Sequence, residues 1–213
     1  AALGALALGA LLGAPFIGMH RLSLAAVMEG PSGGGPGAIF WRLRMPRVLL
    51  AFVAGSALAA SGMAFQAMFR NPLATPYTLG VSSGASLGAV LYLRLGLGLT
   101  LGWFSGVAVF SFGGALGAIL LVYGLTRARR GFSTATMLLA GIAIGMFCSS
   151  LIMFLQFMSD FTQSFRILRW LMGSVETVGY GAVLNTALFV APGCVILACL
   201  TREMNLLTVG DDV

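Results

Sequence analysis

The sequence predicts an all-α fold: a polytopic membrane bundle of about six transmembrane helices, in one domain that spans residues 1–213. Of these residues 59% are hydrophobic and only 8% are charged, whereas an ordinary soluble domain carries about 25% charged residues. Charge-free apolar runs recur, and the run from Val48 to Phe69 is long enough to cross a bilayer as a helix. Because so little polar surface is available to face water, lipid is the expected solvent.

Apolar runs that alternate with polar or glycine- and proline-rich connections are the predicted spans: residues 1–19, 48–69, 77–93, 99–125, 134–158 and 181–200. The first run has no basic stretch before it and no initiating methionine. This favours a first transmembrane helix with its start cut away over a signal peptide. The connection from Ser159 to Tyr180 has room for a short helix at RILRWLMGS, and residues 201–213 are predicted to be a polar tail.

A polar, proline-containing turn joins the second and third runs at residues 70–76. Pro72 and Pro76 lack a backbone N–H and push the preceding residue away from helical geometry. Asn71 and Pro72 together form a dipeptide that commonly starts a turn. The stretch therefore predicts a helix, a tight turn and a second helix within a membrane.

Four sequence motifs then connect the chain to a known family: RLRMPR, FQAMFRNPLATPYTLGVSSGASLG, STATMLLAGIAIG and RWLMGS. With these motifs, which run through most of its length, the chain resembles the FecCD/BtuC-like permease subunits of ABC importers. The resemblance implies a BtuC-like permease fold truncated before its last four helices. It also implies transport of an iron complex (siderophore or haem) or cobalamin across a bacterial inner membrane. Iron complexes are the favoured cargo, because they are the commonest in the family.

The resemblance also implies the partners: a dimer of ATP-binding-cassette ATPases, a second permease copy in a homodimer, and a periplasmic or lipid-anchored substrate-binding protein. No cofactor is expected. The end of the chain, TREMNLLTVGDDV, is similar to the start of the family's ATPase-coupling region, with Gly210 and Asp211 beginning the coupling motif; the alternative is an ordinary polar terminus. The arginines form no long basic face, so nucleic acid is not an expected partner.

Two arginines, Arg44 and Arg47, precede the second run and flank Met45-Pro46. By resemblance they lie on the outer face and dock the binding protein, a task that suits the bidentate pairing of guanidinium with carboxylate. Their other interpretation is interfacial anchoring by snorkelling side chains.

The turn residues Asn71, Pro72 and Leu73 have a second interpretation beyond a simple turn. The resemblance implies that, with Ser133 and Thr134 at the start of the fifth run, they narrow the cytoplasmic mouth of the pathway as a gate. Ser133 could equally act as a helix N-cap that satisfies free backbone donors.

Small residues recur at intervals of four, which places them on one face of a helix and lets a neighbouring backbone approach. The glycines in question are Gly80, Gly84, Gly88, then Gly113 and Gly117, then Gly141 and Gly145. Helix packing is the preferred interpretation of all of them.

Other functions have weaker support. Gly80 to Gly84 fits the G-x-S-x-G nucleophile pattern of an intramembrane serine protease, but that pattern needs a strand–turn–helix context and a histidine partner. The single histidine, His20, lies in the first outer loop. A secondary transporter usually carries ionisable groups near the middle of its spans, and none occurs here. The sequence has no lysine and no Walker A motif, so it is not expected to be an enzyme with its own ATPase site. No metal site is expected, because the three cysteines and five of the methionines lie scattered in apolar runs; these methionines are Met63, Met68, Met146, Met153 and Met158.

Membrane orientation is the point at which two lines of reasoning disagree. With the amino terminus inside, more arginines fall in the outer loops than in the inner ones, which is the reverse of the positive-inside rule. The resemblance implies that the amino terminus is inside, and we follow it.

Overall fold

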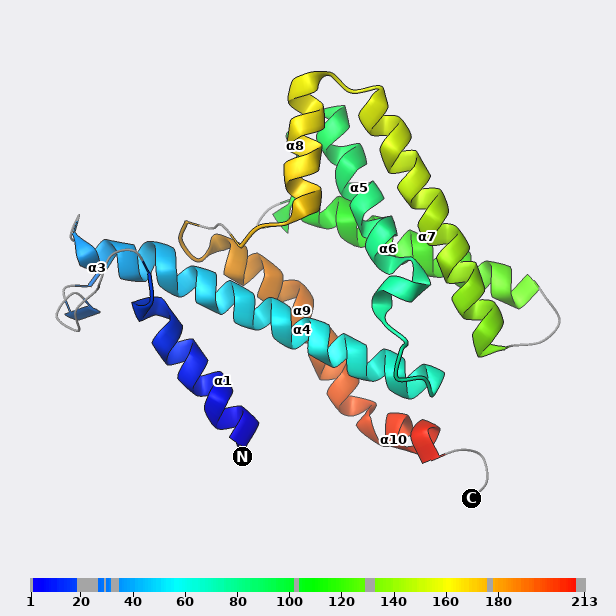
Figure 1. Cartoon of the computed structure of the whole chain (residues 1–213), viewed down its shortest axis with the longest axis horizontal. Helices are drawn as coiled ribbons and strands as arrows, with labels where there is room; N and C mark the ends of the chain where they lie inside the picture. The colour runs from blue at the N-terminus through cyan, green and yellow to red at the C-terminus, as the bar shows by residue number, and fades with distance from the viewer. Residues whose placement is uncertain are drawn as a thin grey trace. The chain divides into compact units, whose positions relative to one another are not determined.

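The computed structural model of the chain (Figure 1) describes residues 2–18, 27–28, 30–31, 35–101, 104–128, 133–175 and 178–209. Within these ranges the chain is almost entirely helical, and its β structure is one short antiparallel pair. In chain order the elements are α1 (Ala2–Gly13), η1 (Ala14–Phe16), α3 (Pro36–Ala38), η2 (Ile39–Arg44), α4 (Met45–Phe69), η3 (Pro76–Leu79), α5 (Val81–Leu95), β1 (Thr100–Leu101), β2 (Phe104–Ser105), α6 (Gly106–Ala128), α7 (Thr134–Phe157), α8 (Phe161–Met172), α9 (Gly181–Cys199) and α10 (Thr201–Val209).

The chain divides into two compact units. One consists of Ala1–Ala60 and Val175–Cys199, and the other of Ser61–Ser174 and Leu200–Val213. Helix α4 belongs to both, because the boundary falls within it. The expectation of a single permease domain stays a prediction.

Four helical segments are long and apolar enough to cross a membrane: Pro36–Phe69, Gly106–Arg127, Thr134–Phe157 and Gly181–Cys199. Two shorter apolar helical segments, Ala2–Phe16 and Val81–Leu95, coincide with the first and third predicted runs. Each predicted apolar run is therefore helical over most of its length in the part of the chain that the structure describes.

Helix α5 begins four residues later than the run that predicted it. Residues Pro76–Leu79 form a 3-10 turn, closed by a Thr75–Thr78 capping box in which the Thr78 Oγ1 donates to the Thr75 carbonyl at 2.6 Å. Gly80 then takes a left-handed conformation, with φ of 71°, which a side chain would disfavour. The apolar content of this run could not reveal the turn, because turn and helix are equally apolar here.

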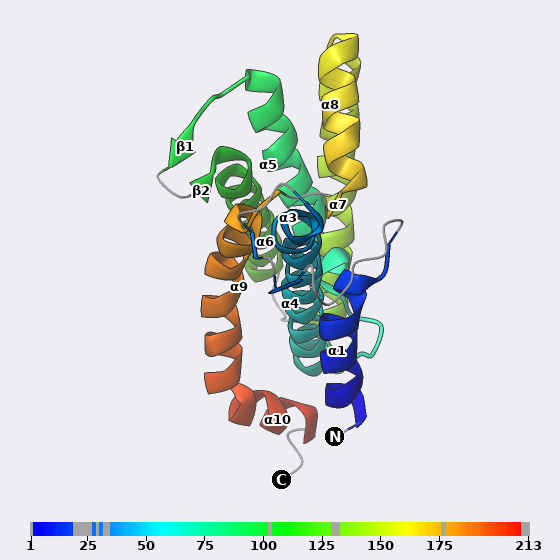
Figure 2. The same cartoon turned by 90° about the vertical axis from the view of Figure 1, so that its left-hand side faces the viewer.

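Helix α6 also starts later than its apolar run, at Gly106. Before it, β1 and β2 pair with Thr100 opposite Ser105 and Leu101 opposite Phe104, a hairpin visible between α5 and α6 in Figure 2. The Tyr92 hydroxyl donates to the Leu99 carbonyl oxygen at 2.9 Å and ties this connection to α5.

Two helices lie where the sequence predicted mainly polar connections. Helix α8 begins at Phe161, five residues before the predicted RILRWLMGS segment, because an Asp160 side-chain oxygen caps the Gln163 N–H at 3.0 Å. The predicted polar tail instead forms α10 up to Val209. Gly210 and Asp211, the predicted coupling residues, lie outside the described residues.

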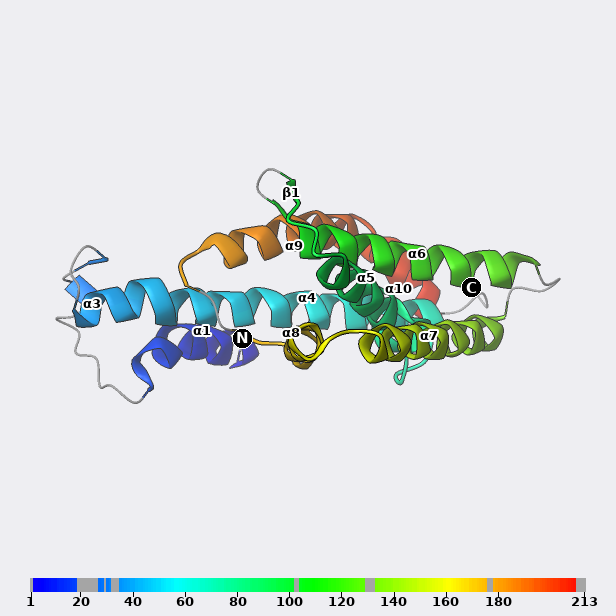
Figure 3. The same ribbon diagram turned by 90° about the horizontal axis from the view of Figure 1, so that it is seen from above.

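The core of the second unit is built by α5 against α6, α7 and α8 (Figures 1 and 3). Phe69, Ala74, Leu79 and Val122 form its central apolar cluster. Side chains from the start of α7, including Met137 and Leu138, pack against that cluster. The turn after α4 and the first turns of α7 therefore lie at the same end of this unit.

Glycines allow the backbones of α5 and α6 to touch. A Cβ on Gly84 would lie 2.6 Å from the Gly114 carbonyl oxygen, and one on Gly88 would overlap the Phe110 carbonyl oxygen. The α6 glycines predicted to pack, Gly113 and Gly117, have no atom within 4 Å of such a Cβ. The contact therefore runs along Gly114 and Ala118, one position further along the helix. Because Gly113 and Gly114 are adjacent, both fit a four-residue interval of small residues, and the sequence alone could not distinguish between them.

Candidate functional site

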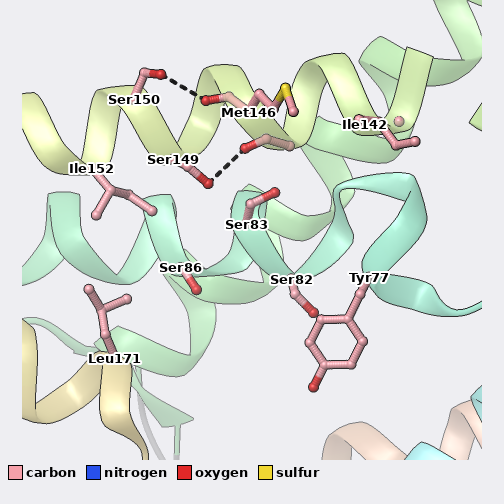
Figure 4. A pocket seen from close by; sticks show the side chains of 12 residues that line it. Tyr77, Ser82, Ser83, Ser86, Ile142, Met146, Ser149, Ser150, Ile152 and Leu171 are labelled. Carbon is pink, nitrogen blue, oxygen red and sulfur yellow. Dashed lines mark hydrogen bonds between the residues drawn. The ribbon is translucent and has the colours of Figure 1, made fainter. Parts of the chain in front are cut away.

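An open groove of about 870 Å³ lies between α5 and α7 in the second unit, with Tyr77 contributed by η3 and Leu171 by α8 (Figure 4). Its lining residues are Tyr77, Ser82, Ser83, Ser86, Gly141, Ile142, Gly145, Met146, Ser149, Ser150, Ile152 and Leu171. Hydroxyl groups come from both walls, and the rest of the lining is apolar or glycine. None of these lining residues is acidic or basic.

Close backbone contact brings the two walls together at one place. A Cβ on Gly141 would lie 2.5 Å from the Thr78 carbonyl oxygen and 2.6 Å from the Leu79 Cα. A Cβ on Gly80 would lie 2.9 Å from the Gly141 carbonyl oxygen. Gly80, just before α5, and Gly141 of α7 therefore let the serines of both helices line the same groove.

The hydroxyls of the groove differ in how they are bonded. Ser149 and Ser150 on α7 donate to the carbonyl oxygens of Gly145 and Met146, each at 2.9 Å, and Figure 4 shows both bonds. Ser83 on α5 donates to the Gly80 carbonyl oxygen at 3.0 Å. Ser82 and Ser86 have no hydrogen-bond partner for their hydroxyls among the described residues.

Asn71, Pro72 and Leu73, the residues of the predicted gate in the turn after α4, form a hydrogen-bonded turn next to the central apolar cluster. Asn71 Oδ1 accepts from the Leu73 N–H at 2.9 Å, and Gln66 Nε2 donates to the Pro72 carbonyl oxygen at 3.1 Å. The Leu73 side chain is 80% exposed, while the adjacent Ala74 is buried. Arg70 precedes the turn with a positive φ of 48°, the left-handed geometry with which many helices end.

Ser133 and Thr134 lie exposed at the start of α7. Ser133 occupies the N-cap position, but its side chain makes no capping hydrogen bond. The predicted N-cap function of its hydroxyl is therefore wrong, and the backbone carbonyl of Ser133 accepts the Met137 N–H instead. Gating by these two residues stays a prediction.

The two predicted docking arginines have different surroundings in the first unit. Arg44 is partly buried, its Nη1 donates to the Pro15 carbonyl oxygen at 3.1 Å, and its guanidinium packs against Gly18. Arg47 is exposed. Arg44 is the last residue of the π-helical segment Ile39–Arg44, after which the Met45 N–H donates to the Phe40 carbonyl oxygen, and Arg47 lies in the first turn of α4. Arg44 therefore has an intramolecular structural function, whatever else it binds.

Arg94, which falls in the connection between the predicted runs 77–93 and 99–125, lies in the last turn of α5. Its Nη1 donates to the Leu155 carbonyl oxygen at 2.8 Å and to Ser159 Oγ at 2.7 Å, so it binds the carboxyl-terminal end of α7. A cation at this place is favoured by the helix dipole. The sequence signal was a lone arginine directly after an apolar run, but nothing in the sequence pointed to a partner more than sixty residues away.

Comparison with known proteins decides the family. The FecCD transport family matches residues 5–213. The chain belongs to the FecCD transport family. The chain is 38% identical to the vitamin B12 import system permease protein BtuC of Salmonella arizonae, over 80% of this chain and 50% of BtuC. It is 36% identical to the hemin transport system permease protein HmuU of Yersinia pestis, over 94% of this chain and 60% of HmuU.

A solved structure of a metal-chelate type ABC transporter in an inward-facing conformation also matches. It has a TM-score of 0.80 and 29% identity, over 99% of this chain and 63% of that chain. This FecCD chain thus spans between half and about two thirds of the length of these relatives. The matches confirm the predicted membrane-permease fold. Together with four helices able to span a bilayer, they place the chain in the bacterial inner membrane.

Proposed function

We propose that the chain forms the transmembrane pathway of an ATP-binding-cassette importer, as its permease subunit, for an iron complex (siderophore or haem) or cobalamin. The family match over residues 5–213 carries this proposal. The names of the relatives, which refer to vitamin B12, hemin and a metal chelate, support the cargo class. The uncharged groove between α5 and α7 is suited to line part of such a pathway, because it offers hydrogen bonds without a fixed charge.

The proposed assembly contains a second copy of the permease, a pair of ATPase subunits and an outer binding protein. The permease hydrolyses no ATP itself. Closure of the ATPase pair is transmitted through the region around α10 to the membrane helices. At the inner mouth, the exposed Leu73 and the start of α7 narrow the pathway, since the core cluster places both at the same end of the unit.

Two alternative functions have less support. For a serine protease, Ser82 would need a base within hydrogen-bond reach, and the described groove lining contains no histidine, lysine or carboxylate. For a secondary transporter, the same lining offers no carboxylate or histidine that could couple cargo movement to a proton.

The function can be tested with the full-length protein, co-expressed with any ATPase and binding protein that neighbouring genes are found to encode. We expect the ATPase to co-purify, and reconstituted vesicles to take up cargo only with ATP and not with vanadate. Uptake that needs an ion gradient but no ATP would identify a secondary transporter instead. Labelling of Ser82 by a fluorophosphonate would identify a protease.

Reversing the charge of Arg47 tests the docking surface. We expect Arg47→Glu to weaken capture of the loaded binding protein by roughly tenfold or more, because the exposed guanidinium would be replaced by a charge that repels the partner's carboxylates. Binding of labelled binding protein to the permease–ATPase complex in nanodiscs measures the effect. Arg47 is a cleaner site than Arg44, because Arg44→Glu would also break the bond to Pro15. Unchanged capture by the Arg47 variant would contradict the docking function.

A further inference from the structure

Two serines on α5 present unused hydroxyls to the groove. Ser82 and Ser86 lie four residues apart, hence about 6 Å along the helix axis and on one face. Both side chains are partly buried, and both line the groove (Figure 4). In the part of the chain that the structure describes, neither hydroxyl has a partner. Each can therefore donate one hydrogen bond to a molecule in the groove.

The α7 wall offers the complementary property. The hydroxyls of Ser149 and Ser150 already donate hydrogen bonds to the backbone carbonyl oxygens one turn earlier in α7. A hydroxyl whose proton is in use can still accept through its oxygen lone pairs. Ser82 and Ser86 on α5 are therefore the serines free to donate, whereas Ser83 on α5 and both α7 serines can accept.

The rest of the lining limits what the groove can hold. Ile142, Met146, Ile152 and Leu171 provide apolar surface, and no lining residue can neutralise an ion. A charged group that leaves water to contact this lining would find no counter-charge there, which is unfavourable. The volume of about 870 Å³ lies within the range of roughly 300–1,000 Å³ that is usual for small-molecule sites.

We propose that this groove is a cargo-binding site for the uncharged, oxygen-rich face of a metal chelate or similar molecule. Ser82 and Ser86 donate to carbonyl-type or hydroxamate oxygens of the cargo, and Ser149 and Ser150 accept from its N–H or O–H groups. Apolar parts of the cargo lie against Ile142, Met146 and Leu171. This inference rests on the proposed transport function and adds to it the chemistry by which the permease itself holds cargo.

The test uses the complete importer in proteoliposomes. Four probes are offered separately: a neutral ferric trihydroxamate, a trianionic ferric tricatecholate, haem and cyanocobalamin. We expect uptake of a probe that carries uncharged amide, hydroxyl or hydroxamate oxygens, the trihydroxamate or cyanocobalamin. The double variant Ser82→Ala/Ser86→Ala should lower that uptake about tenfold, since each lost hydrogen bond weakens binding several-fold.

Four further measurements separate this effect from damage to the fold. ATP hydrolysis and capture of the binding protein should be unchanged in the double variant, and Ser82→Thr/Ser86→Thr, which keeps both hydroxyls, should restore uptake. Ser56→Ala, at an exposed serine on α4 outside the groove, is the matched control and should transport normally. Wild-type uptake by the double alanine variant, or uptake of the trianionic probe alone, would overturn the inference. A wild-type complex that imports none of the four probes would contradict the proposed function itself.

Discussion

The largest loss of stability is expected from Gly88→Ala, because the new methyl group would overlap the Phe110 carbonyl oxygen of the neighbouring helix. A backbone oxygen cannot rotate away as a side chain can, so α5 and α6 would have to separate. Ala89 and Val90, next along α5, are completely buried, which leaves the helix little room to shift. Overpacking of this kind typically costs about 1–3 kcal/mol. We expect a lower unfolding midpoint for the full-length permease in detergent, and less folded protein in the membrane.

The matched control is Gly113→Ala on the facing helix, where no atom lies within 4 Å of the added carbon. Alanine is the better helix former by up to about 1 kcal/mol, so this variant should be as stable as the wild type or more stable. Gly84→Ala should fall between the two, with contacts at 2.6 Å to Gly114 and Ala118. Equal unfolding midpoints for the Gly88 and Gly113 variants would contradict the close contact of α5 and α6.

The glycines at the contact between α5 and α6 illustrate what the sequence could and could not predict. The apolar runs located the long helices, because hydropathy and length depend only on local composition. A four-residue interval of small residues predicted close packing, but adjacent glycines in α6 fit the interval equally well. The choice of Gly114 over Gly113 depends on which face of α6 meets α5, and that is a tertiary property.

The ends of the helices were also difficult to predict from the sequence, for a related reason. Asp160 caps α8 with a single side-chain bond, and Gly80 ends the turn before α5 with a left-handed residue. Each of these two helix boundaries depends on a single residue, whereas the helices themselves are predicted from a pattern along many residues. The candidate site shows the same limit, because the sequence around Ser82 matches only a serine-nucleophile pattern that lacks its histidine partner. The groove that Ser82 lines forms only in the folded protein, where α7 contributes Ser149 and Ser150 to the same lining.

Replacing Arg94 is expected to have the second largest effect. Its guanidinium holds the end of α7 through the Leu155 carbonyl oxygen and Ser159 Oγ, and Ser159 Oγ itself donates to the same carbonyl at 2.7 Å. Hydrogen bonds from a charged donor contribute roughly 1.5–3 kcal/mol each, and partial burial limits screening by solvent. Arg94→Leu should therefore lower the free energy of unfolding by about 2 kcal/mol. Arg94→Lys keeps the charge but loses the planar fork, so it should recover only part of the loss.

The position of the Arg94 contacts predicts which part of the protein would be destabilised by the substitution. Helix α8 begins two residues after Ser159 and contributes Leu171 to the groove, so a loosened α7–α8 turn would disturb that wall. Hydrogen exchange should accelerate in peptides that cover residues 155–164 of Arg94→Leu. The control Arg166→Leu removes an exposed arginine from α8 and should leave both exchange and stability nearly unchanged. If the two leucine variants behaved alike, the end of α7 would have to be held by its own backbone caps, and Arg94 would be a surface anchor.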